Sequence, residues 1–307
     1  MQREHSRTLV PRPASALLCD TWASRKLSLG CSLLDACLEG GIDSFGITEI
    51  AGEAGAGKTQ LVLQLLLQSQ LPAPMGGLAG GAIYLHGDNS NVNAALKRID
   101  SLAAEFAVCH ANVGAQSERL KENIFVLQVD TAEELWETVD QRVPALLRER
   151  GVRLLVIDSI AGLHRGFPDE PTGVNTTGQY WQRTQQLLRL SARLKQLSET
   201  FCIAVVVTNQ VTDKPLDNIQ RRCAAQWELG PCGKPDGSMR VPALGLSWSF
   251  CVNTRIILTR HAVGDGLSNL SHGGSDWHRA LHVAWSPRMP EASVQFQVRN
   301  QGVVGVR

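Results

Sequence analysis

Short, mostly apolar runs recur along the first two thirds of the chain, and each is long enough for one strand. The runs cover residues 46–51, 82–86, 124–129, 152–157 and 203–208. Mostly apolar runs of this length are typical of parallel strands, because helices cover both faces of a parallel sheet. Between them lie stretches that we expect to be helical, at 58–70, 93–108 and 179–200. The alternation predicts an α/β fold with a mostly parallel central sheet.

The last part of the chain follows a different pattern. Apolar and polar residues alternate near 252–259, 281–285 and 294–299, which is typical of strands with one solvated face. We expect these segments to add antiparallel strands at the C-terminal edge of the sheet. Residues 212–242, which precede them, are rich in Gly, Pro and Arg. We expect a loop there that is too long to be a passive connection.

The first residues of the chain differ from the rest in how much regular structure they predict. Residues 1–26 predict a flexible N-terminal arm, because Pro, Ser and Arg dominate there and no periodicity is visible. Residues 27–307 predict a single large domain, for which the chain length suffices. We expect this domain to open with a short helix near 28–38. Further along, Asp130 or Thr131 is placed to cap a helix, with Glu133 and Glu134 in position for a capping box.

Composition excludes several classes of protein. Hydrophobic residues make up 43% of the chain and charged residues 19%, which is typical of globular rather than disordered proteins. No apolar run approaches the roughly 20 residues needed to cross a bilayer, so we expect no membrane partner. The net charge of +1 gives no attraction of the whole surface to nucleic acid, so DNA binding requires a local basic patch. None of the eight cysteines forms a C-x-x-C pair, which argues against a zinc or disulfide framework.

One segment fits the pattern G-x-x-x-x-G-K-[ST] at every fixed position, between an apolar strand and a helix-forming run. It is Gly52-Glu53-Ala54-Gly55-Ala56-Gly57-Lys58-Thr59, continued by Gln60. The glycines let consecutive backbone N–H groups converge on a phosphate, and the following helix adds the positive end of its dipole. Lys58 is placed for the β- and γ-phosphates, and the Thr59 hydroxyl suits Mg²⁺ as a ligand. The segment predicts a site for ATP, or a close relative of it, with Mg²⁺.

Two acidic residues follow apolar runs and are candidates for catalysis. Asp158 ends the run 152–157, far downstream of the glycine loop. An acid in this place holds the magnesium water shell in phosphate-loop ATPases, and we favour this role for Asp158 over that of a cap. Asp88 follows the run 82–86, where a carboxylate can orient or deprotonate the attacking water. The alternative for Asp88 is a solvated turn residue.

Several segments together resemble the RecA-like recombinases of eukaryotes. They are 27–30 with 34–35, the glycine loop continued as Gln60-Leu61, 155–159 and 207–211. Further matches at 71–72, 76–78, 241–248 and 286–290 resemble one family of recombinase paralogues, the third of the X-ray repair cross-complementing series, in its plant form with a very short N-terminal region. The resemblance covers about 27–306 and implies that residues 27–307 form a RecA-like phosphate-loop ATPase domain.

The resemblance also implies a function. It implies an ATP-dependent, DNA-binding mediator of homologous recombination and of double-strand-break and crosslink repair. The expected partners are DNA, another recombinase paralogue in a hetero-oligomer and the main strand-exchange recombinase. The expected compartment is the nucleus, with the cytoplasm as a second. By the same resemblance, Gln210 senses the γ-phosphate; the alternative is a polar residue at a strand end, satisfied by backbone.

Family members carry two DNA-facing loops, which correspond here to about 164–178 and 212–241. Positive side chains in these stretches are candidate contacts to DNA phosphates, with a solvated loop face as the alternative. The candidates are Arg165, Arg221, Arg222, Lys234 and Arg240.

The chain departs from the family pattern at three places. Asp88 stands where the family carries Glu, and a misplacement of about 1 Å can cost on the order of 100-fold in rate. We therefore expect firm ATP binding with slow, DNA-dependent hydrolysis. Trp285 stands where related recombinases have an Asp that caps the ATP of the neighbouring subunit, so such capping is either absent here or uses apolar contact. The predicted arm is also too short for the N-terminal helical DNA-binding domain of the main recombinase.

Three functions stay open at this point. The first is the mediator that uses ATP to assemble with partners on DNA. The second is a self-sufficient, DNA-stimulated ATPase or strand-exchange recombinase, against which Asp88 and Trp285 argue. The third is a scaffold without direct DNA contact, in which the nucleotide only stabilises the fold.

Overall fold

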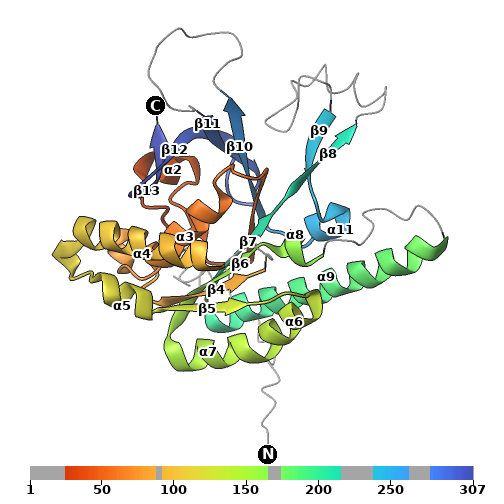
Figure 1. Ribbon diagram of the computed structural model, residues 1–307, viewed down its shortest axis with the longest axis horizontal. Coiled ribbons are helices and arrows are strands. Elements are labelled where there is room, and N and C mark those ends of the chain that lie inside the picture. Colours follow the sequence, from red (N-terminus) through yellow and green to blue (C-terminus); the bar gives the residue numbers. More distant parts are fainter. Residues whose placement is uncertain (1–24, 88–91, 165–173, 216–237, 263–276, 307) are drawn as a thin grey trace, which may run out of the picture.

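The computed structural model describes residues 25–87, 92–164, 174–215, 238–262 and 277–306. Within them a nine-stranded sheet has the order β13-β12-β11-β10-β3-β7-β6-β4-β5 (Figure 1). Its strands, in chain order, are β3 (Ile47–Gly52), β4 (Gly81–His86), β5 (Ile124–Gln128), β6 (Val152–Asp158), β7 (Ala204–Asn209), β10 (Thr254–Ala262), β11 (Trp277–Trp285), β12 (Ala292–Arg299) and β13 (Gly302–Val306).

The direction of the strands divides this sheet into two parts. From β10 through β3, β7, β6 and β4 to β5, each strand is parallel to its neighbour. From β10 through β11 and β12 to β13, each pair is antiparallel. This confirms the predicted α/β class, with a mostly parallel sheet and antiparallel strands at its C-terminal edge.

Helices cover both faces of the parallel strands. One core cluster includes residues of α3 (Lys58–Gln68), α4 (Val92–Cys109) and α5 (Ser117–Glu122). The other includes residues of α6 (Ala132–Glu137), α7 (Val143–Arg150) and α9 (Val174–Phe201). The shorter elements are α2 (Ser32–Cys37), η1 (Ala73–Met75), η2 (Ala111–Val113), the π-helical turn η3 (Thr138–Arg142), α8 (Ile160–Leu163) and α11 (Gly245–Ser249).

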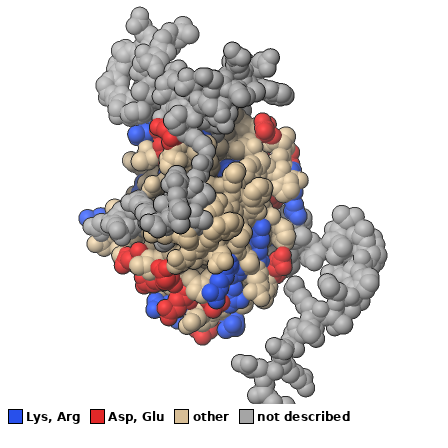
Figure 2. Space-filling model, turned by 90° about the vertical axis from the view of Figure 1, so that its right-hand side faces the viewer, with Lys and Arg blue, Asp and Glu red and all other residues tan. Residues whose placement is uncertain are grey.

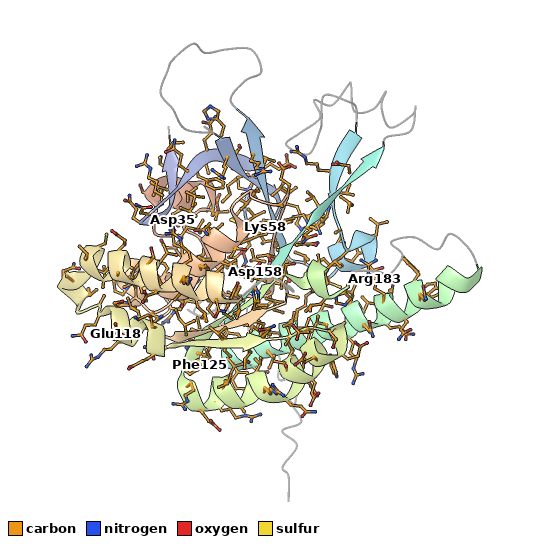
Figure 3. All side chains as sticks on the ribbon, viewed as in Figure 1. Asp35, Lys58, Glu118, Phe125, Asp158 and Arg183 are labelled. Carbon is orange, nitrogen blue, oxygen red and sulfur yellow. The ribbon has the colours of Figure 1, made fainter. Side chains whose placement is uncertain are left out.

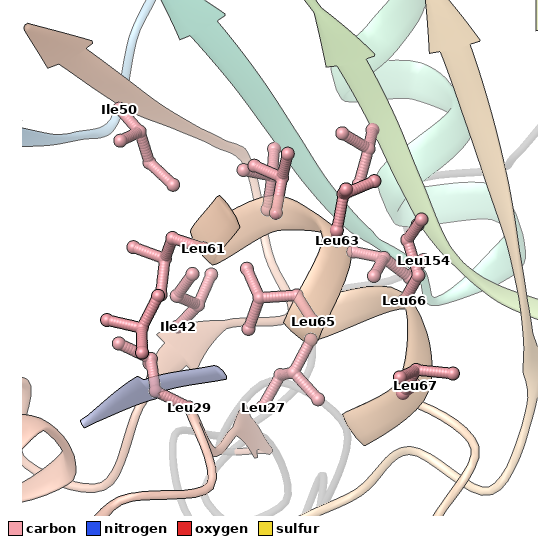
Figure 4. Close-up of a cluster of buried hydrophobic side chains, with 14 of the residues drawn as sticks. Leu27, Leu29, Ile42, Ile50, Leu61, Leu63, Leu65, Leu66, Leu67 and Leu154 are labelled. Atoms are coloured by element: carbon pink, nitrogen blue, oxygen red, sulfur yellow. The ribbon is translucent and has the colours of Figure 1, made fainter. Parts of the chain in front are cut away.

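Strand β4 shows why the predicted strands are apolar throughout. Ala82 and Tyr84 point into the cluster around α3, whereas Ile83 and Leu85 point into the cluster on the other face. Successive side chains of a strand face opposite sides of the sheet, so a strand buried on both sides needs an apolar residue at nearly every position. Figure 4 shows part of the first cluster, in which leucines of α3 pack beside Leu27 and Leu29.

Two segments differ from the expectation. Residues 212–242 were expected to be a loop, but their ends form the hairpin β8 (Val211–Pro215) and β9 (Ser238–Pro242). Strand β13 was not predicted, because five residues at the end of a chain give too little pattern. It is held by the buried Gln64, whose Oε1 accepts from Val303 N at 2.6 Å and whose Nε2 donates to Val303 O at 3.2 Å.

The structure also shows how the chain begins its described part and which residue caps α6. Residues 1–24 of the predicted arm lie outside the described residues, and Lys26 already pairs with Asp43 between β1 (Lys26–Leu27) and β2 (Ile42–Asp43). Thr131, rather than Asp130, caps α6: its Oγ1 accepts from Glu134 N at 3.1 Å. The Glu134 carboxylate in turn accepts from Asp130 N at 3.0 Å. No helix among the described residues is long and apolar enough to cross a membrane.

A fully buried carboxylate, that of Glu49, joins four elements at the centre of the sheet. Its Oε1 accepts from Asn209 Nδ2 at 2.7 Å and from Trp248 Nε1 at 2.9 Å. Its Oε2 accepts from Arg255 Nε in a buried ion pair. Glu49 thereby ties β3 to β7, α11 and β10, just before the chain enters the glycine loop.

We expect Glu49→Gln to lower the free energy of unfolding by about 3–5 kcal/mol, because it leaves the buried charge of Arg255 without its partner. Urea denaturation followed by circular dichroism measures this loss. Glu105→Gln, at an exposed position of α4, is the matched control and should change stability by no more than about 0.5 kcal/mol. Equal effects of the two substitutions would contradict a structural role for Glu49.

Candidate nucleotide-binding site

The glycine loop connects the end of β3 to the start of α3, and its backbone needs glycine at defined places. Gly55 and Gly57 have φ angles of 76° and 107°, a region that residues with a side chain rarely adopt. A Cβ atom at Gly52 would lie 2.5 Å from the carbonyl oxygen of Leu258, so β10 leaves no room for a side chain. The predicted pattern is therefore required by the conformation of this loop.

The side chains of the loop divide between the core and the exposed side. Ala56 is fully buried in the core cluster, whereas Ala54 and Thr59 are exposed. Lys58 Nζ donates to the carbonyl oxygens of Gly52 at 2.7 Å and Glu53 at 3.0 Å. The side chain at the end of the loop therefore bonds to the backbone at its start. The ammonium group thus lies against the loop in this structure, and its contact with the β- and γ-phosphates stays a prediction.

A cavity of about 430 Å³ opens beside the loop. This volume lies within the range of roughly 300–1,000 Å³ that is typical of small-molecule sites. Gly55, Gly57, Lys58, Thr59 and Gln60 form one wall. The rest of the lining was not predicted from the sequence: Arg98, Arg279, Val298, Arg299 and Asn300. The lining residues include four cations and no acid, which fits an anion such as a polyphosphate.

Arg98 fixes the shape of this cavity. Its Nε donates to Gln60 Oε1 at 2.7 Å, and its Nη1 and Nη2 donate to the carbonyl oxygens of Asn300 at 3.0 Å and Arg299 at 2.7 Å. It therefore joins α3 to the turn between β12 and β13. Partial burial lowers the pKa of the Arg98 guanidinium, which stays charged because the ordinary value is far above neutral pH.

Asp158 is the last residue of β6 and is nearly buried, with 6% of its surface exposed. Its Oδ2 accepts from the Tyr84 hydroxyl at 3.0 Å, and its Oδ1 accepts from the Thr208 hydroxyl. Each oxygen keeps further lone-pair capacity, so a water can also bond there. Lys58 follows the end of β3 and Asp158 ends β6, so both lie at the carboxyl ends of parallel strands; both residues are labelled in Figure 3. The parallel topology explains this placement, because the carboxyl ends of β3 and β6 meet at one edge.

The other candidates are placed as follows. Gln210 follows β7 and is half-buried, and its carbonyl oxygen accepts from Ala243 N at 2.9 Å. Arg240 lies on β9 and forms an ion pair with Glu53 of the glycine loop at 3.6 Å. Asp88, Arg165, Arg221, Arg222 and Lys234 lie outside the described residues. The roles predicted for all of these residues stay predictions.

Trp285, which departs from the family pattern, contacts Arg255 of the same chain. The guanidinium carbon of Arg255 lies 4.1 Å from the centroid of the Trp285 ring, a cation–π contact. Trp285 as a whole is 39% exposed. Trp285 therefore covers the outer side of the cation that pairs with Glu49.

Comparisons with known proteins agree with the resemblance of the motifs. A model of the Rad51 family matches residues 24–231. The chain is 32% identical to the "DNA repair protein XRCC3 homolog" of Arabidopsis thaliana, over 92% of this chain and 94% of that protein. It is 34% identical to the "DNA repair protein XRCC3" of Bos taurus, over 92% of this chain and 75% of that protein. It is 28% identical to the human "DNA repair protein RAD51 homolog 2", over 91% of this chain and 68% of that protein.

The family match covers more than half of the chain, and it includes both the glycine loop and Asp158. The XRCC3 proteins match over nearly the whole chain at more than 30% identity. The nine-stranded sheet has the α/β arrangement expected of a RecA-like domain. The chain therefore belongs to the Rad51 family, as a paralogue of the XRCC3 type.

Proposed function

We propose that the chain binds ATP with Mg²⁺ in the cavity beside the glycine loop. The observation that carries this proposal is that the loop has the complete phosphate-binding pattern and lines a cavity. The residues that line this cavity include four cations and no acid. The backbone N–H groups of the loop and the N-terminus of α3 would bind the phosphates. Lys58, Arg98, Arg279 and Arg299 would neutralise their negative charge.

The described residues also fit a magnesium ion that keeps most of its waters. Thr59 offers an exposed hydroxyl beside the cavity, and Asp158 offers carboxylate oxygens whose orientation is fixed by Tyr84 and Thr208. No group of three or more His, Cys, Asp or Glu side chains in the described ranges could form a protein cage for a metal. Mg²⁺ typically binds through one or two protein oxygens plus phosphates and water. When bound with the nucleotide, the ion would neutralise charge on the phosphates.

The function that this site serves is in DNA repair and recombination, in line with the names of the Rad51 and XRCC3 relatives. We propose that the chain acts in the nucleus as an ATP-dependent mediator of homologous recombination, in a complex with another recombinase paralogue and the main recombinase. On the face seen in Figure 2, described basic and acidic side chains are intermixed. Because the net charge of the chain is only +1, the attraction to DNA is proposed to come from local contacts, for which the stretches near 164–178 and 212–241 are the candidates.

Hydrolysis is proposed to be slow. Asp88 takes the place of a Glu, and its shorter side chain withdraws the carboxylate from the position that the water would need. Asp158 and Gln210 complete the set of residues proposed to act at the phosphates, holding the metal waters and sensing the γ-phosphate. Slow hydrolysis favours the mediator over a self-sufficient recombinase or ATPase motor, because the latter requires rapid ATP turnover.

Lys58→Ala should abolish the rise in melting temperature that ATP produces. At about 100 times its Kd, a ligand adds about 2.7 kcal/mol of stability, which raises the Tm of a domain of this size by several degrees. Differential scanning fluorimetry with and without ATP and Mg²⁺ measures this. Lys97→Ala, at an exposed position of α4, should keep the full shift.

The same Lys58→Ala chain tests whether ATP gates assembly. Co-purification with the paralogue partner should require ATP with the unaltered chain and should fail with this variant. If the variant assembled as well as the unaltered chain, ATP-gated assembly would be wrong. Its melting temperature without nucleotide serves as the control for folding.

Asp88→Glu should raise the rate of ATP hydrolysis by on the order of 100-fold, because the longer side chain restores the reach of the base. Phosphate release is measured with the paralogue partner and single-stranded DNA present. Asp88→Ala should stay as slow as the unaltered chain or become slower. The hypothesis of slow hydrolysis fails if the unaltered protein turns ATP over at the rate of a motor and Asp88→Ala abolishes that rate.

The affinity of the assembled protein for DNA should fall as salt rises. For single strands, log K falls against log salt with a slope of about −0.7 for each phosphate that is neutralised. Fluorescence anisotropy with a labelled oligonucleotide, at several salt concentrations, gives the slope. A flat response would favour the scaffold without direct DNA contact over the mediator.

A further inference from the structure

We propose that Arg240 is a positioning residue that couples the glycine loop to the β8–β9 hairpin, so that nucleotide binding and the order of the hairpin depend on each other. The proposal rests on the nucleotide binding proposed above. It gives Arg240 a different role from the DNA contact expected from its charge and position.

Both ends of the hairpin are fixed to the strand that leads into the glycine loop. Asn209, two residues before β8, donates to Glu49 at 2.7 Å, and Trp248, in the helix after β9, donates to the same carboxylate at 2.9 Å. The bond from Ala243 N to Gln210 O, at 2.9 Å, closes the base between the two strands. The base of the hairpin therefore cannot shift without disturbing β3.

Beyond this base, the side chain of Arg240 on β9 contacts Glu53 of the glycine loop. Its Nη1 lies 3.6 Å from Glu53 Oε1, and the two side chains are only 14% and 28% exposed. Both of these atoms are buried and have no hydrogen-bond partner. Because the facing atoms of this ion pair make no hydrogen bond, the contact depends on the attraction between their charges, and it responds to any new charge brought close to it.

A nucleotide brings such a charge. The phosphates are negative, so a bare Glu53 carboxylate at the edge of the loop would repel them, and Arg240 removes that repulsion by neutralising Glu53. In return, the phosphates add to the field that attracts the guanidinium, which holds β9 against the loop. By thermodynamic linkage, a nucleotide that stabilises this contact is itself bound more tightly when the contact is present.

The test is a double-mutant cycle with Arg240→Gln, Glu53→Gln and the double variant. Titration with a fluorescent ATP analogue measures affinity, and hydrogen exchange followed by mass spectrometry measures the protection of 211–215 and 238–242. Arg240→Gln should weaken ATP binding about two- to fivefold, the range of a partly exposed ion pair. The double variant should recover most of this loss, because the unpaired carboxylate has gone.

In the unaltered chain, ATP should slow amide exchange in both strands of the hairpin, and each single variant should lose this response. Glu53→Gln is informative by itself, because it removes the same ion pair without a change in the hairpin. Arg193→Gln, which removes a comparable ion pair with Asp140 at 3.0 Å on α9, is the matched control and should leave both measurements unchanged.

Three results would overturn the proposal. If the two substitutions were additive in ATP affinity, Arg240 would not act through Glu53. If the unaltered chain bound ATP but its hairpin exchanged equally fast with and without it, the coupling would be wrong while the proposed function stood. If the unaltered chain did not bind ATP at all, the proposed function and the coupling would both fail.

Discussion

The burial of one carboxylate determines how the central strands meet. Taking the charge of Glu49 out of water costs several kcal/mol, and this cost is offset only if the charge is paired and its oxygens accept hydrogen bonds. Arg255, Asn209 and Trp248 together meet both needs. They come from β10, β7 and α11, so these three elements must all lie beside β3 at the level of Glu49. A sheet in which any of them shifted would leave a charge buried without a partner, and the glycine loop begins only three residues after Glu49.

The parallel topology then gathers the chemistry at one edge. Strands β3, β7, β6 and β4 are parallel neighbours, so the residues at their carboxyl ends lie together along one edge of the sheet. Gly52, Asp158 and Gln210 meet there although they lie far apart in the sequence. The hairpin β8–β9 leaves the same edge directly after β7, which is why a charge at Arg240 reaches the loop at Glu53. The site and the segment expected to face DNA are thus neighbours because of strand direction alone.

The sequence predicted what depends on neighbouring residues and missed what depends on tertiary contacts. The glycine loop, Asp158 and the parallel strands follow from local patterns, because each occupies a continuous stretch of chain. Arg98 and Asn300 could not be found in this way: they line the cavity because α4 packs beside the turn between β12 and β13, and β13 itself was not predicted. Glu49 also gave no signal, because an acid within an apolar strand reveals its importance only when its partners are known.

Trp285 shows how the buried network and the departure from the family pattern are related. Its ring lies on the guanidinium of Arg255, whose Nε pairs with Glu49. A carboxylate at this position would compete with Glu49 for the same cation, whereas a ring adds a cation–π contact worth about 0.5–2 kcal/mol and accepts no hydrogen bond from Arg255. The Trp thus supports the pair beneath it and carries no negative group, whereas the resemblance leads us to expect an acid at this position. The support that reaches the start of the glycine loop through Glu49 therefore extends, within one chain, from β3 through Arg255 to the surface at Trp285.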